Sequence, residues 1–254
     1  MSTVQHYQVR LNAHTICFEL RRSNRQSLGF RIDHNGLRLM APNTMALTDI
    51  KQALTQKSSW ILHHLANQQE RAKKHNHSQQ QWENYGNLPF MGAIIQAIAQ
   101  PAMTTPHFTG QSFNPVKGDK LLLPCSKEAT IQTRTQWVEI WLKQQAQLWF
   151  EGRLQHFLQA SGDQLLGWRL SNAKTRWGSC SSKKRININW RLIHFEHVVI
   201  DYVIAHEVAH LKFMHHGPEF WDHLYHLMPN FAVGQEVLKQ HQPGEMPALI
   251  PLSR

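Results

Sequence analysis

The stretch DYVIAHEVAHLKFMHHGPEF, residues 201–220, decides the fold, because it places histidines and a glutamate at the spacing of a catalytic metal centre. On an α-helix, positions i and i+4 share a face, so His206 and His210 can point at one metal ion from adjacent turns. Glu207 lies about 100° around the helix, outside the coordinating pair but near enough to hold a metal-bound water. The pattern predicts a metal-binding helix that carries its own general base.

A third ligand must come from outside those two turns. His216 follows six residues after His210, and Gly217-Pro218 provides a break that can let the chain bring His216 back toward the pair. Three protein ligands leave one coordination position open for water, which is typical of catalytic zinc. We therefore expect one zinc ion, with His215 as the rival third ligand.

Apolar residues flank the motif at helical spacing and predict an amphipathic helix from about Glu196 to Phe213 with one buried side. A motif that occurs within such a pattern is better supported than an isolated match, because chance spacing carries no helical context. The residues that form the apolar side are Val199, Ile200, Val203, Ile204, Val208 and Leu211.

Length and cysteine usage bound the class of protein. A chain of 254 residues can bury one substantial core or two modest ones without disulfides, and its 3 cysteines show no CxxC spacing. Reduced thiols in a cytosolic setting fit this usage. The N-terminus lacks the pattern of a signal peptide, and no apolar run approaches the length that spans a bilayer. We expect a cytoplasmic protein without a membrane partner.

The chain is basic, with 27 Lys and Arg against 17 Asp and Glu and a formal net charge of +10. Such a surface attracts anions, including nucleic acid, although no nucleic-acid motif accompanies the charge. A solvated basic surface without a specific partner is the alternative interpretation. The cluster formed by Arg21, Arg22, Arg25 and Arg31 is the candidate contact for nucleic acid.

The first part of the chain, residues 1–125, is expected to form a mainly β lobe with one long helix. Residues 5–22 and 28–41 predict strands, with Asn35-Gly36 as a type I′ hairpin turn. Apolar spacing predicts the helix over about 48–74, followed by a polar connector at 75–81. Further strands are expected at 88–99 and 120–123.

Residues 126–241 are expected to form the second lobe, before a flexible proline-rich tail at 242–254. Thr133 and Gln136 are placed as a capping box for a long helix that Gly162 ends. Two strands are expected at 166–170 and 185–190, before the metal-binding helix. Pro218 favours a further helix through about Leu227, because proline suits the first helical position. The whole pattern is α+β.

Several segments together are similar to the YgjP-like metallopeptidase family. The N-terminal half shares the order of Arg21 to Arg25, the Asn35-Gly36 hairpin, Trp60-Ile61 and Leu88-Pro89-Phe90, so the resemblance covers nearly the whole chain. The segments that carry it in the second half are KTRWGSCSS at 174–182, ININWRLI at 186–193, the His206 motif and HGPEFW at 216–221.

The resemblance implies a zincin-like catalytic lobe related to SprT-like proteases, with the HExxH helix packed on a small sheet. It also implies one zinc held by His206, His210 and His216, with Glu207 as the catalytic base. Typical members carry Asn where this chain has His215 and Ser where it has Gly217. The spacing of the histidines also equals that of metzincins, but Phe213 occupies the position where those enzymes place glycine.

The expected activity is zinc-dependent hydrolysis of peptide bonds in peptide or protein substrates, with Glu207 activating the zinc-bound water. Arg176, Arg185 and Tyr202 are polar candidates for a further donor to the oxyanion, none favoured over the others. The strand at 186–190 could offer its edge to an extended peptide, or it could be an ordinary paired strand. Cys180 is not expected to be a nucleophile.

The alternative function is a nucleic-acid-associated or nucleic-acid-activated protein that uses the basic N-terminal surface. In that case the protein is an SprT-like protease or a binding module with a structural metal. The substitution Glu207→Gln separates the peptidase from the binding module with a structural metal, since a structural site tolerates it and a hydrolytic site does not.

Overall fold

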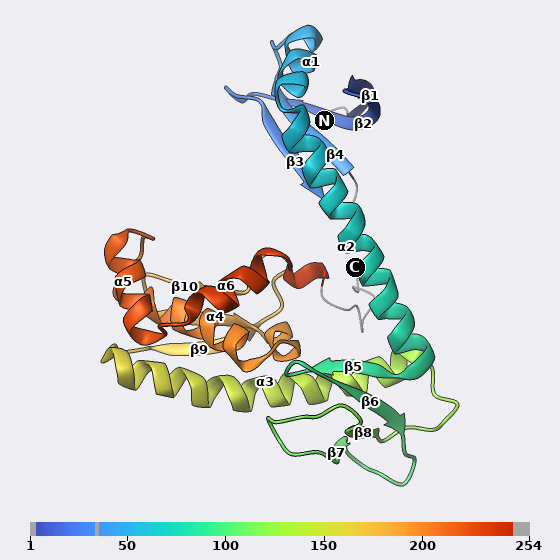
Figure 1. Cartoon of the computed structure of the whole chain (residues 1–254), viewed down its shortest axis with the longest axis vertical. Helices are drawn as coiled ribbons and strands as arrows, with labels where there is room; N and C mark the ends of the chain where they lie inside the picture. The colour runs from blue at the N-terminus through green and yellow to red at the C-terminus, as the bar shows by residue number, and fades with distance from the viewer. Residues whose placement is uncertain (1–3, 34–35, 246–254) are drawn as a thin grey trace. The chain divides into compact units, whose positions relative to one another are not determined.

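The computed structural model describes residues 4–33 and 36–245 and divides into two compact units, Met1–Asn76 and His77–Arg254 (Figure 1). We expected the division at residues 125 and 126, after the strands at 120–123. The structure instead includes those strands in the second unit, because Leu88, Leu121 and Leu123 are buried in its core. The nine C-terminal residues of the expected flexible tail lie outside the described residues.

The first unit is a four-stranded sheet of order β1-β2-β4-β3, with β1 in contact with α1. Pairing is antiparallel for β1–β2 and β3–β4 and parallel for β2–β4. Alternate residues such as Phe18 and Leu20 in β2 are buried together with Leu39 of β4 and Ile50 of α1. The strands are β1 (Val4–Leu11), β2 (His14–Ser23), β3 (Gly29–Asp33) and β4 (Gly36–Pro42).

The β3–β4 hairpin confirms the strands that were expected around Asn35-Gly36. Asp33 pairs with Gly36, and Gly36 has a φ of 96°, which glycine adopts without steric cost. Asn35 itself lies outside the described residues, so the expected turn type stays a prediction.

Two helices replace the single helix that was expected over 48–74. They are α1 (Leu47–Gln56) and α2 (Ser58–Tyr85), and the break lies at Lys57. The segment 75–81, expected as a connector, is helical in α2. No proline or glycine interrupts residues 58–85, and the segment contains five glutamines, which favour helix.

The second unit opens with a four-stranded sheet of order β5-β6-β8-β7, in which β6 and β8 are parallel. The expected strands at 88–99 and 120–123 are confirmed, with a turn between β5 and β6. The strands are β5 (Asn87–Phe90), β6 (Ala93–Ala99), β7 (His107–Phe108) and β8 (Lys120–Leu123).

The N-terminal cap of the long helix α3 (Ile131–Ser161) lies three residues before the expected cap, Thr133. The side chain of Thr130 accepts a hydrogen bond from the Thr133 N–H, so Thr130 is the cap and Thr133 lies inside the first turn. Gly162 ends the helix with a φ of 71°, as expected.

A second small sheet and three helices complete this unit. The sheet has the order β10-β11-β9, and β10 is a strand that the sequence did not predict, as α6 is a helix that it did not predict. The elements are β9 (Gly167–Ser171), β10 (Gly178–Cys180), β11 (Arg185–Asn189), the 3-10 helix η1 (Trp190–His194), α4 (His197–Ala209), α5 (Pro218–Leu227), α6 (Phe231–Lys239) and the 3-10 helix η2 (Pro243–Glu245).

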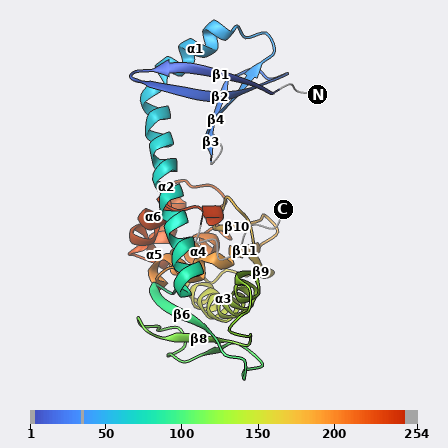
Figure 2. The same cartoon turned by 90° about the vertical axis from the view of Figure 1, so that its right-hand side faces the viewer.

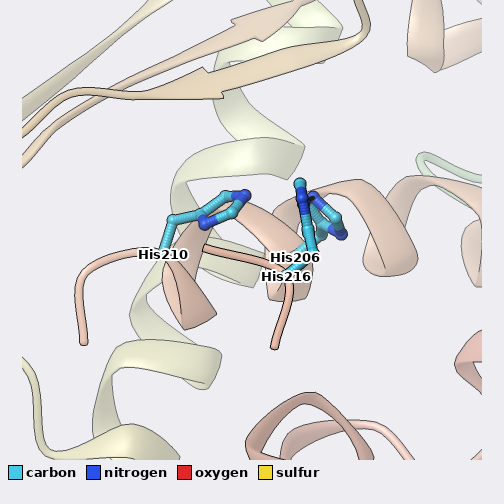
Figure 3. Close-up of side chains that lie close together, drawn as sticks. All are labelled: His206, His210 and His216. Carbon is cyan, nitrogen blue, oxygen red and sulfur yellow. Dashed lines mark hydrogen bonds between the residues drawn. The ribbon is translucent and has the colours of Figure 1, made fainter. Parts of the chain in front are cut away.

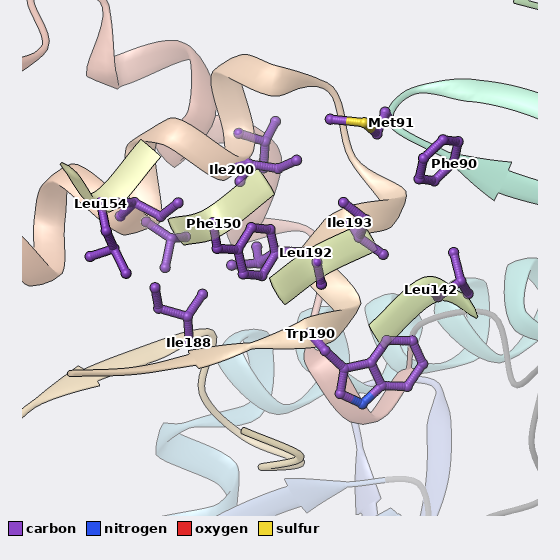
Figure 4. Packing of buried hydrophobic residues seen from close by; sticks show 14 of the residues in the cluster. Phe90, Met91, Leu142, Phe150, Leu154, Ile188, Trp190, Leu192, Ile193 and Ile200 are labelled. Carbon is purple, nitrogen blue, oxygen red and sulfur yellow. The ribbon is translucent and has the colours of Figure 1, made fainter. Parts of the chain in front are cut away.

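One continuous core lies between α3, α4 and the sheet of β9–β11. Figure 4 shows Phe150 and Leu154 of α3 together with Ile188 of β11 and Ile200 of α4. Each of these side chains is at most 1% exposed. The core thus holds α4 from both sides. Within the described residues, no helix combines the length and apolar character needed to cross a bilayer.

Candidate metal centre and active site

Helix α4, which carries the histidine motif, is largely buried. The expected apolar side is confirmed, because Val199, Ile200, Val203, Ile204, Val208 and Leu211 are all buried. The other side, which includes Asp201 and Tyr202, is half-buried, and no residue from His197 to Ala209 is exposed. The helix contacts α3, α5, α6, β10, β11 and η1, and these contacts fix its position.

Three imidazoles converge at the end of this helix. The nitrogen atoms that His206, His210 and His216 can offer to a metal lie within 4.8 Å of one another. The ring centroids are 4.8 Å apart for His206 and His210, 5.0 Å for His206 and His216, and 4.7 Å for His210 and His216. Figure 3 shows the ring of His210 directed toward the other two. The structure brings together all three of the expected ligands.

The loop after α4 turns the chain so that His216 returns to the pair. Helix α4 ends at Ala209, and α5 starts at Pro218 with Gly217 as its cap. The indole N–H of Trp221 donates to the carbonyl oxygen of His216 at 3.1 Å, which fixes the loop against α5. The neighbouring His215 is exposed and lies outside the histidine cluster. Of the two rivals, only His216 reaches the other imidazoles.

The hydrogen bonds and burial of the histidines favour neutral rings. His210 Nδ1 lies 2.9 Å from the carbonyl oxygen of Phe213, an acceptor that holds the proton on Nδ1 and leaves Nε2 as the free electron pair. Burial, with the neighbouring His210 and His216, lowers the pKa of His206 to about 3. Neutral imidazoles are the form that coordinates metal.

A phenylalanine that the sequence did not single out forms the floor of the site. Phe220, fully buried in α5, lies 4.9 Å from the ring of His206, 4.6 Å from that of His210 and 4.8 Å from that of His216. It therefore fixes the orientation of all three rings at once. The sequence offered one indication of this role. Phe220 lies two residues after Pro218, in the first turn of α5, and this turn must face the motif because His216 comes just before it.

Glu207 lies at the same end of α4, pressed against β10. Its side chain is buried, and a Cβ placed on Gly178 would lie 2.4 Å from the Glu207 Oε1 atom, so a larger residue there would have to displace the carboxylate. Burial raises the pKa of the Glu207 carboxyl to about 8, against the opposing charge of Arg176. Glu207 Oε2 is buried without a hydrogen-bond partner among the described residues.

The strand order places β10, and not β11, at the edge beside Glu207. Of the two alternatives for residues 186–190, the ordinary paired strand is confirmed and the free edge is wrong, because β11 pairs with β10 on one side and β9 on the other. The Trp177 carbonyl accepts from Asn189 N and Ser181 N donates to the Arg185 carbonyl, so these alternate residues face β11. Gly178 and Cys180 therefore direct their main-chain groups to the open edge.

Asn189 is a structural residue, and not a solvent-facing one. It is fully buried, and its Nδ2 donates to the carbonyl oxygens of Ala173 at 2.7 Å and of Arg176 at 3.2 Å. These bonds hold the segment that leads into β10. The alternation of polar and apolar residues in β11 predicts that Asn189 faces solvent. The structure differs because the loop at 173–176 covers the polar face at the end of this strand.

Three candidate donors from the sequence occupy different places. Arg176 is exposed but acts electrostatically on Glu207. Tyr202 is half-buried beside His206, with 5.7 Å between the ring centroids. Arg185 is exposed at the start of β11. Arg176 and Tyr202 thus lie near the reacting groups.

Other residues considered from the sequence have structural environments. Burial and the charge of Glu207 raise the pKa of Cys180 to about 11, so its thiol stays protonated and is a poor nucleophile. Asp201 forms an ion pair with Arg153 at 2.6 Å and orients no metal-binding histidine. Glu219 is exposed, and Met228 is buried in the core.

The N-terminal arginine cluster is largely engaged within the first unit. Arg21 pairs with Glu19, and Arg31 pairs with Asp33 at 3.2 Å. Arg22 donates to three carbonyl oxygens, those of residues 42, 43 and 45. The side chains of Arg21 and Arg31 are still 49% and 60% exposed, so contact of this cluster with nucleic acid stays a prediction.

The histidine cluster fits a divalent metal ion by its chemistry. Three neutral imidazole nitrogens suit zinc and related transition metals, and an adjacent carboxylate is held outside the cluster. His206 Nδ1 is also buried without a hydrogen-bond partner among the described residues, which shows that this end of α4 is not satisfied by protein groups alone.

Comparison with known proteins gives one family. The family model described as YgjP-like, metallopeptidase domain, matches residues 26–241. No curated protein matches the chain. Among solved structures, the crystal structure of the metallopeptidase zymogen of Pyrococcus abyssi abylysin is similar, with 22% sequence identity and a TM-score of 0.33, over 36% of this chain and 93% of that chain.

Proposed function

The chain belongs to the YgjP-like metallopeptidase family, and from this premise we propose that it hydrolyses peptide bonds at a single zinc ion. His206, His210 and His216 hold the ion, and Glu207 is the catalytic base. The observation that carries the proposal is the convergence of three imidazoles within 4.8 Å beside a buried carboxylate. An arrangement in which three ligands come from the protein suits catalysis, because a coordination position stays open.

The ion and the chain have separate tasks. When bound, zinc acts as a Lewis acid that makes water a better nucleophile and polarises the carbonyl group of a peptide. The chain orients the rings: Phe220 supports all three, and the Phe213 carbonyl fixes the tautomer of His210. Rigid placement of the ligands keeps the reacting groups in register.

Glu207 moves the proton during hydrolysis. Its carboxylate accepts the proton from the attacking water and then donates it to the nitrogen of the departing amine. Gly178 allows this carboxylate to lie directly against β10, since any larger residue would displace it. The base therefore stands between the helix and the edge strand.

A peptide substrate binds along β10. The main-chain groups of Gly178 and Cys180 face the open edge of the sheet, and an extended peptide can pair with them as an added strand. Such pairing places a scissile amide next to Glu207, which touches Gly178. The same edge accepts different side chains, because it recognises main-chain groups.

The substitution Glu207→Gln tests the base. We expect hydrolysis of a peptide library to fall by about 10³-fold, because general acid and base catalysis is lost while the imidazoles are unchanged. Zinc content, measured on the same protein, should stay at one ion per chain. Glu219→Gln is the matched control, as Glu219 is exposed in α5. Equal hydrolysis by Glu207→Gln and the unchanged chain would reject Glu207 as the base.

Substitution of neighbouring histidines tests the third ligand. We expect His216→Ala to lower zinc affinity by more than 10-fold and to lower activity with it, because one coordinating ring is lost. His215→Ala should leave both unchanged, since His215 lies outside the cluster. Metal titration of the apoprotein measures the difference. The opposite ranking would assign the third ligand to His215.

A further inference from the structure

The segment that forms the sheet of β9, β10 and β11 has an extreme charge composition. From Gln164 to Phe195 the chain contains no aspartate or glutamate, although the whole chain has 17. The same segment contains seven cationic residues: Arg169, Lys174, Arg176, Lys183, Lys184, Arg185 and Arg191.

Six of these cations are exposed, all except Arg191. Within the part of the chain that the structure describes, none of the six forms an ion pair. Elsewhere on the surface of the second unit, exposed lysines do pair with acids, as Lys143 does with Glu139. The charge of this sheet is therefore open to an external partner.

The cations lie at both ends of the edge strand. Lys174 and Arg176 precede β10, and Lys183 and Lys184 form the turn between β10 and β11, closed by the Lys184 N–H to the Ser181 carbonyl. The strands β10, β11 and β9 lie beside one another in this unit (Figure 2). A chain lying along β10 would meet positive charge before and after Glu207.

The face of the sheet opposite to the core continues this polar surface. Arg169 Nε donates to Asn187 Oδ1 at 2.7 Å, and Asn187 Nδ2 donates to Ser179 Oγ at 3.1 Å. The hydrogen bonds cross all three strands and end on β10. They fix Arg169 and Asn187, so the outer face is a rigid polar surface beside the edge strand.

We infer that the substrates are acidic peptide segments, with carboxylates on both sides of the scissile bond, bound along β10 between these cations. This inference rests on the proposed function and names its substrate class. Electrostatic attraction of this kind raises the rate of encounter and selects the partner, more than it adds raw affinity. Its strength depends on salt, because the cations are exposed.

An acidic peptide fits this surface better than a nucleic acid does. The edge of β10 offers main-chain hydrogen bonds, which an extended peptide can satisfy and a phosphate backbone cannot. The nearby Trp177 is not a free stacking platform, since its Nε1 donates to the His241 carbonyl and its ring packs edge-on against Phe195. The cations alone would accept either polymer, so the test separates them.

The first experiment compares three fluorogenic peptides with the zinc-loaded full chain. They share one core and carry Glu, Gln or Lys on both sides of the scissile bond. We expect kcat/KM to rise at least about 10-fold from Gln to Glu at low ionic strength and to fall from Gln to Lys. Raising the salt concentration should reduce these ratios. Equal values for the three peptides would overturn the inference.

The second experiment reverses charge at both ends of β10. In the double variant Lys174→Glu and Lys183→Glu, the ratio of kcat/KM for the Glu peptide to that for the Gln peptide should fall at least about 10-fold. The matched control, Lys117→Glu and Lys120→Glu, changes net charge equally at exposed positions before and in β8. An equal fall in the control would overturn the inference, because the effect would then be global.

Binding to the zinc-loaded Glu207→Gln protein separates the inference from the proposed function. If this protein binds the Glu peptide more tightly than the Gln peptide while the unchanged chain cleaves neither, recognition of acidic peptides along β10 is supported and the proposed function fails. If the unchanged chain cleaves the Gln and Glu peptides equally, the function stands and the inference fails. A DNA oligonucleotide that binds and loses affinity in the Lys174 and Lys183 variant, while the peptides show no preference, would overturn it in favour of nucleic acid.

Discussion

The molecule contains two small basic sheets, and they use their cations in opposite ways. In the first unit, Glu19 pairs with Arg21 and Arg38, and Asp33 pairs with Arg31 and Arg38, so these three arginines have acidic partners within the sheet. In the sheet of β9–β11 the exposed cations have no acidic neighbour in the segment. Charge that is paired internally stabilises a fold, whereas unpaired charge is available to a partner.

The two units also use their phenylalanine and glycine residues differently. The first unit uses its aromatic and glycine residues for packing and turns, as Phe18 and Gly36 show. In the second unit, Phe220 and Gly178 also position the groups of the site. Matched substitutions in the two units can therefore separate structural roles from functional ones.

The largest expected effect comes from matched phenylalanines. Phe220→Ala and Phe18→Ala should each lower the free energy of unfolding by about 3 to 5 kcal/mol, because both side chains are at most 2% exposed. Only Phe220→Ala should also lower zinc affinity, by about 10- to 100-fold, since it removes the floor under three ligand rings. Chemical denaturation and metal titration measure the two effects. Unchanged zinc affinity in a folded Phe220→Ala protein would break the contrast.

Matched glycines come next. Gly178→Ala should lower kcat by about 10²-fold, because the added Cβ would lie 2.4 Å from Glu207 Oε1 and must displace the carboxylate. Gly36→Ala should leave kcat unchanged and cost about 1 kcal/mol of stability, since its φ of 96° is strained for alanine. Steady-state kinetics with denaturation curves checks both. A Gly178→Ala enzyme of full activity would show that β10 does not constrain the base.

The units should respond to different pH ranges. Burial lowers the pKa of His194 in the second unit to about 4 from 6.5, so its contribution to stability is present above pH 6.5 and is lost as the pH falls toward 4. The hydrogen bond from Arg21, with Arg38 nearby, lowers the pKa of Glu19 in the first unit below 4.5, so that contribution is lost only at lower pH.

Hydrogen exchange, read separately for peptides of each unit, measures this difference. From pH 6.5 to 4.5 the second unit should lose free energy of unfolding, while the first unit keeps the contribution of Glu19. The loss from His194 should reach a value on the order of 3 kcal/mol when the pH falls to 4. His194→Asn should weaken the pH dependence of the second unit. Parallel loss in both units over this range would contradict the assignment.

The smallest effect compares one paired and one unpaired cation. Arg38→Ala should cost about 1 kcal/mol, because its half-buried guanidinium bridges Glu19 and Asp33. Lys183→Ala should change stability by less than about 0.5 kcal/mol, since it is exposed and outside any ion pair of the described residues. Thermal unfolding of the two variants measures the difference. Equal costs would mean that the N-terminal pairs do not stabilise the sheet.

The features that follow from short-range sequence patterns could be predicted. The i, i+4 spacing placed His206 and His210 on one helical face, and Gly162 and Pro218 marked where helices end and begin. The clustering of His206, His210 and His216 was predictable for the same reason, since these residues lie within one short stretch of chain. The identity of the ion and the role of Glu207 remain proposals.

The features that depend on pairing between distant segments could not be predicted. Alternation in residues 185–189 indicates a strand, but it does not say which neighbour lies on each side, so β10 was missed. Burial of Asn189 depends on a loop that covers it. The charge of Arg21 is visible in the sequence, but its neutralisation requires the register that places Glu19 beside it. These facts belong to tertiary structure.

The burial of α4, along which no residue is exposed, limits how this protein can evolve. An ordinary surface helix tolerates exchange at every third or fourth position, where side chains face water. Along α4, eight of the thirteen residues are buried and the other five are half-buried, so most replacements of the motif's apolar neighbours would be rejected for loss of packing even if the histidines remained. Divergence among related chains should therefore accumulate in the segments that surround this helix, while the helix itself drifts slowly.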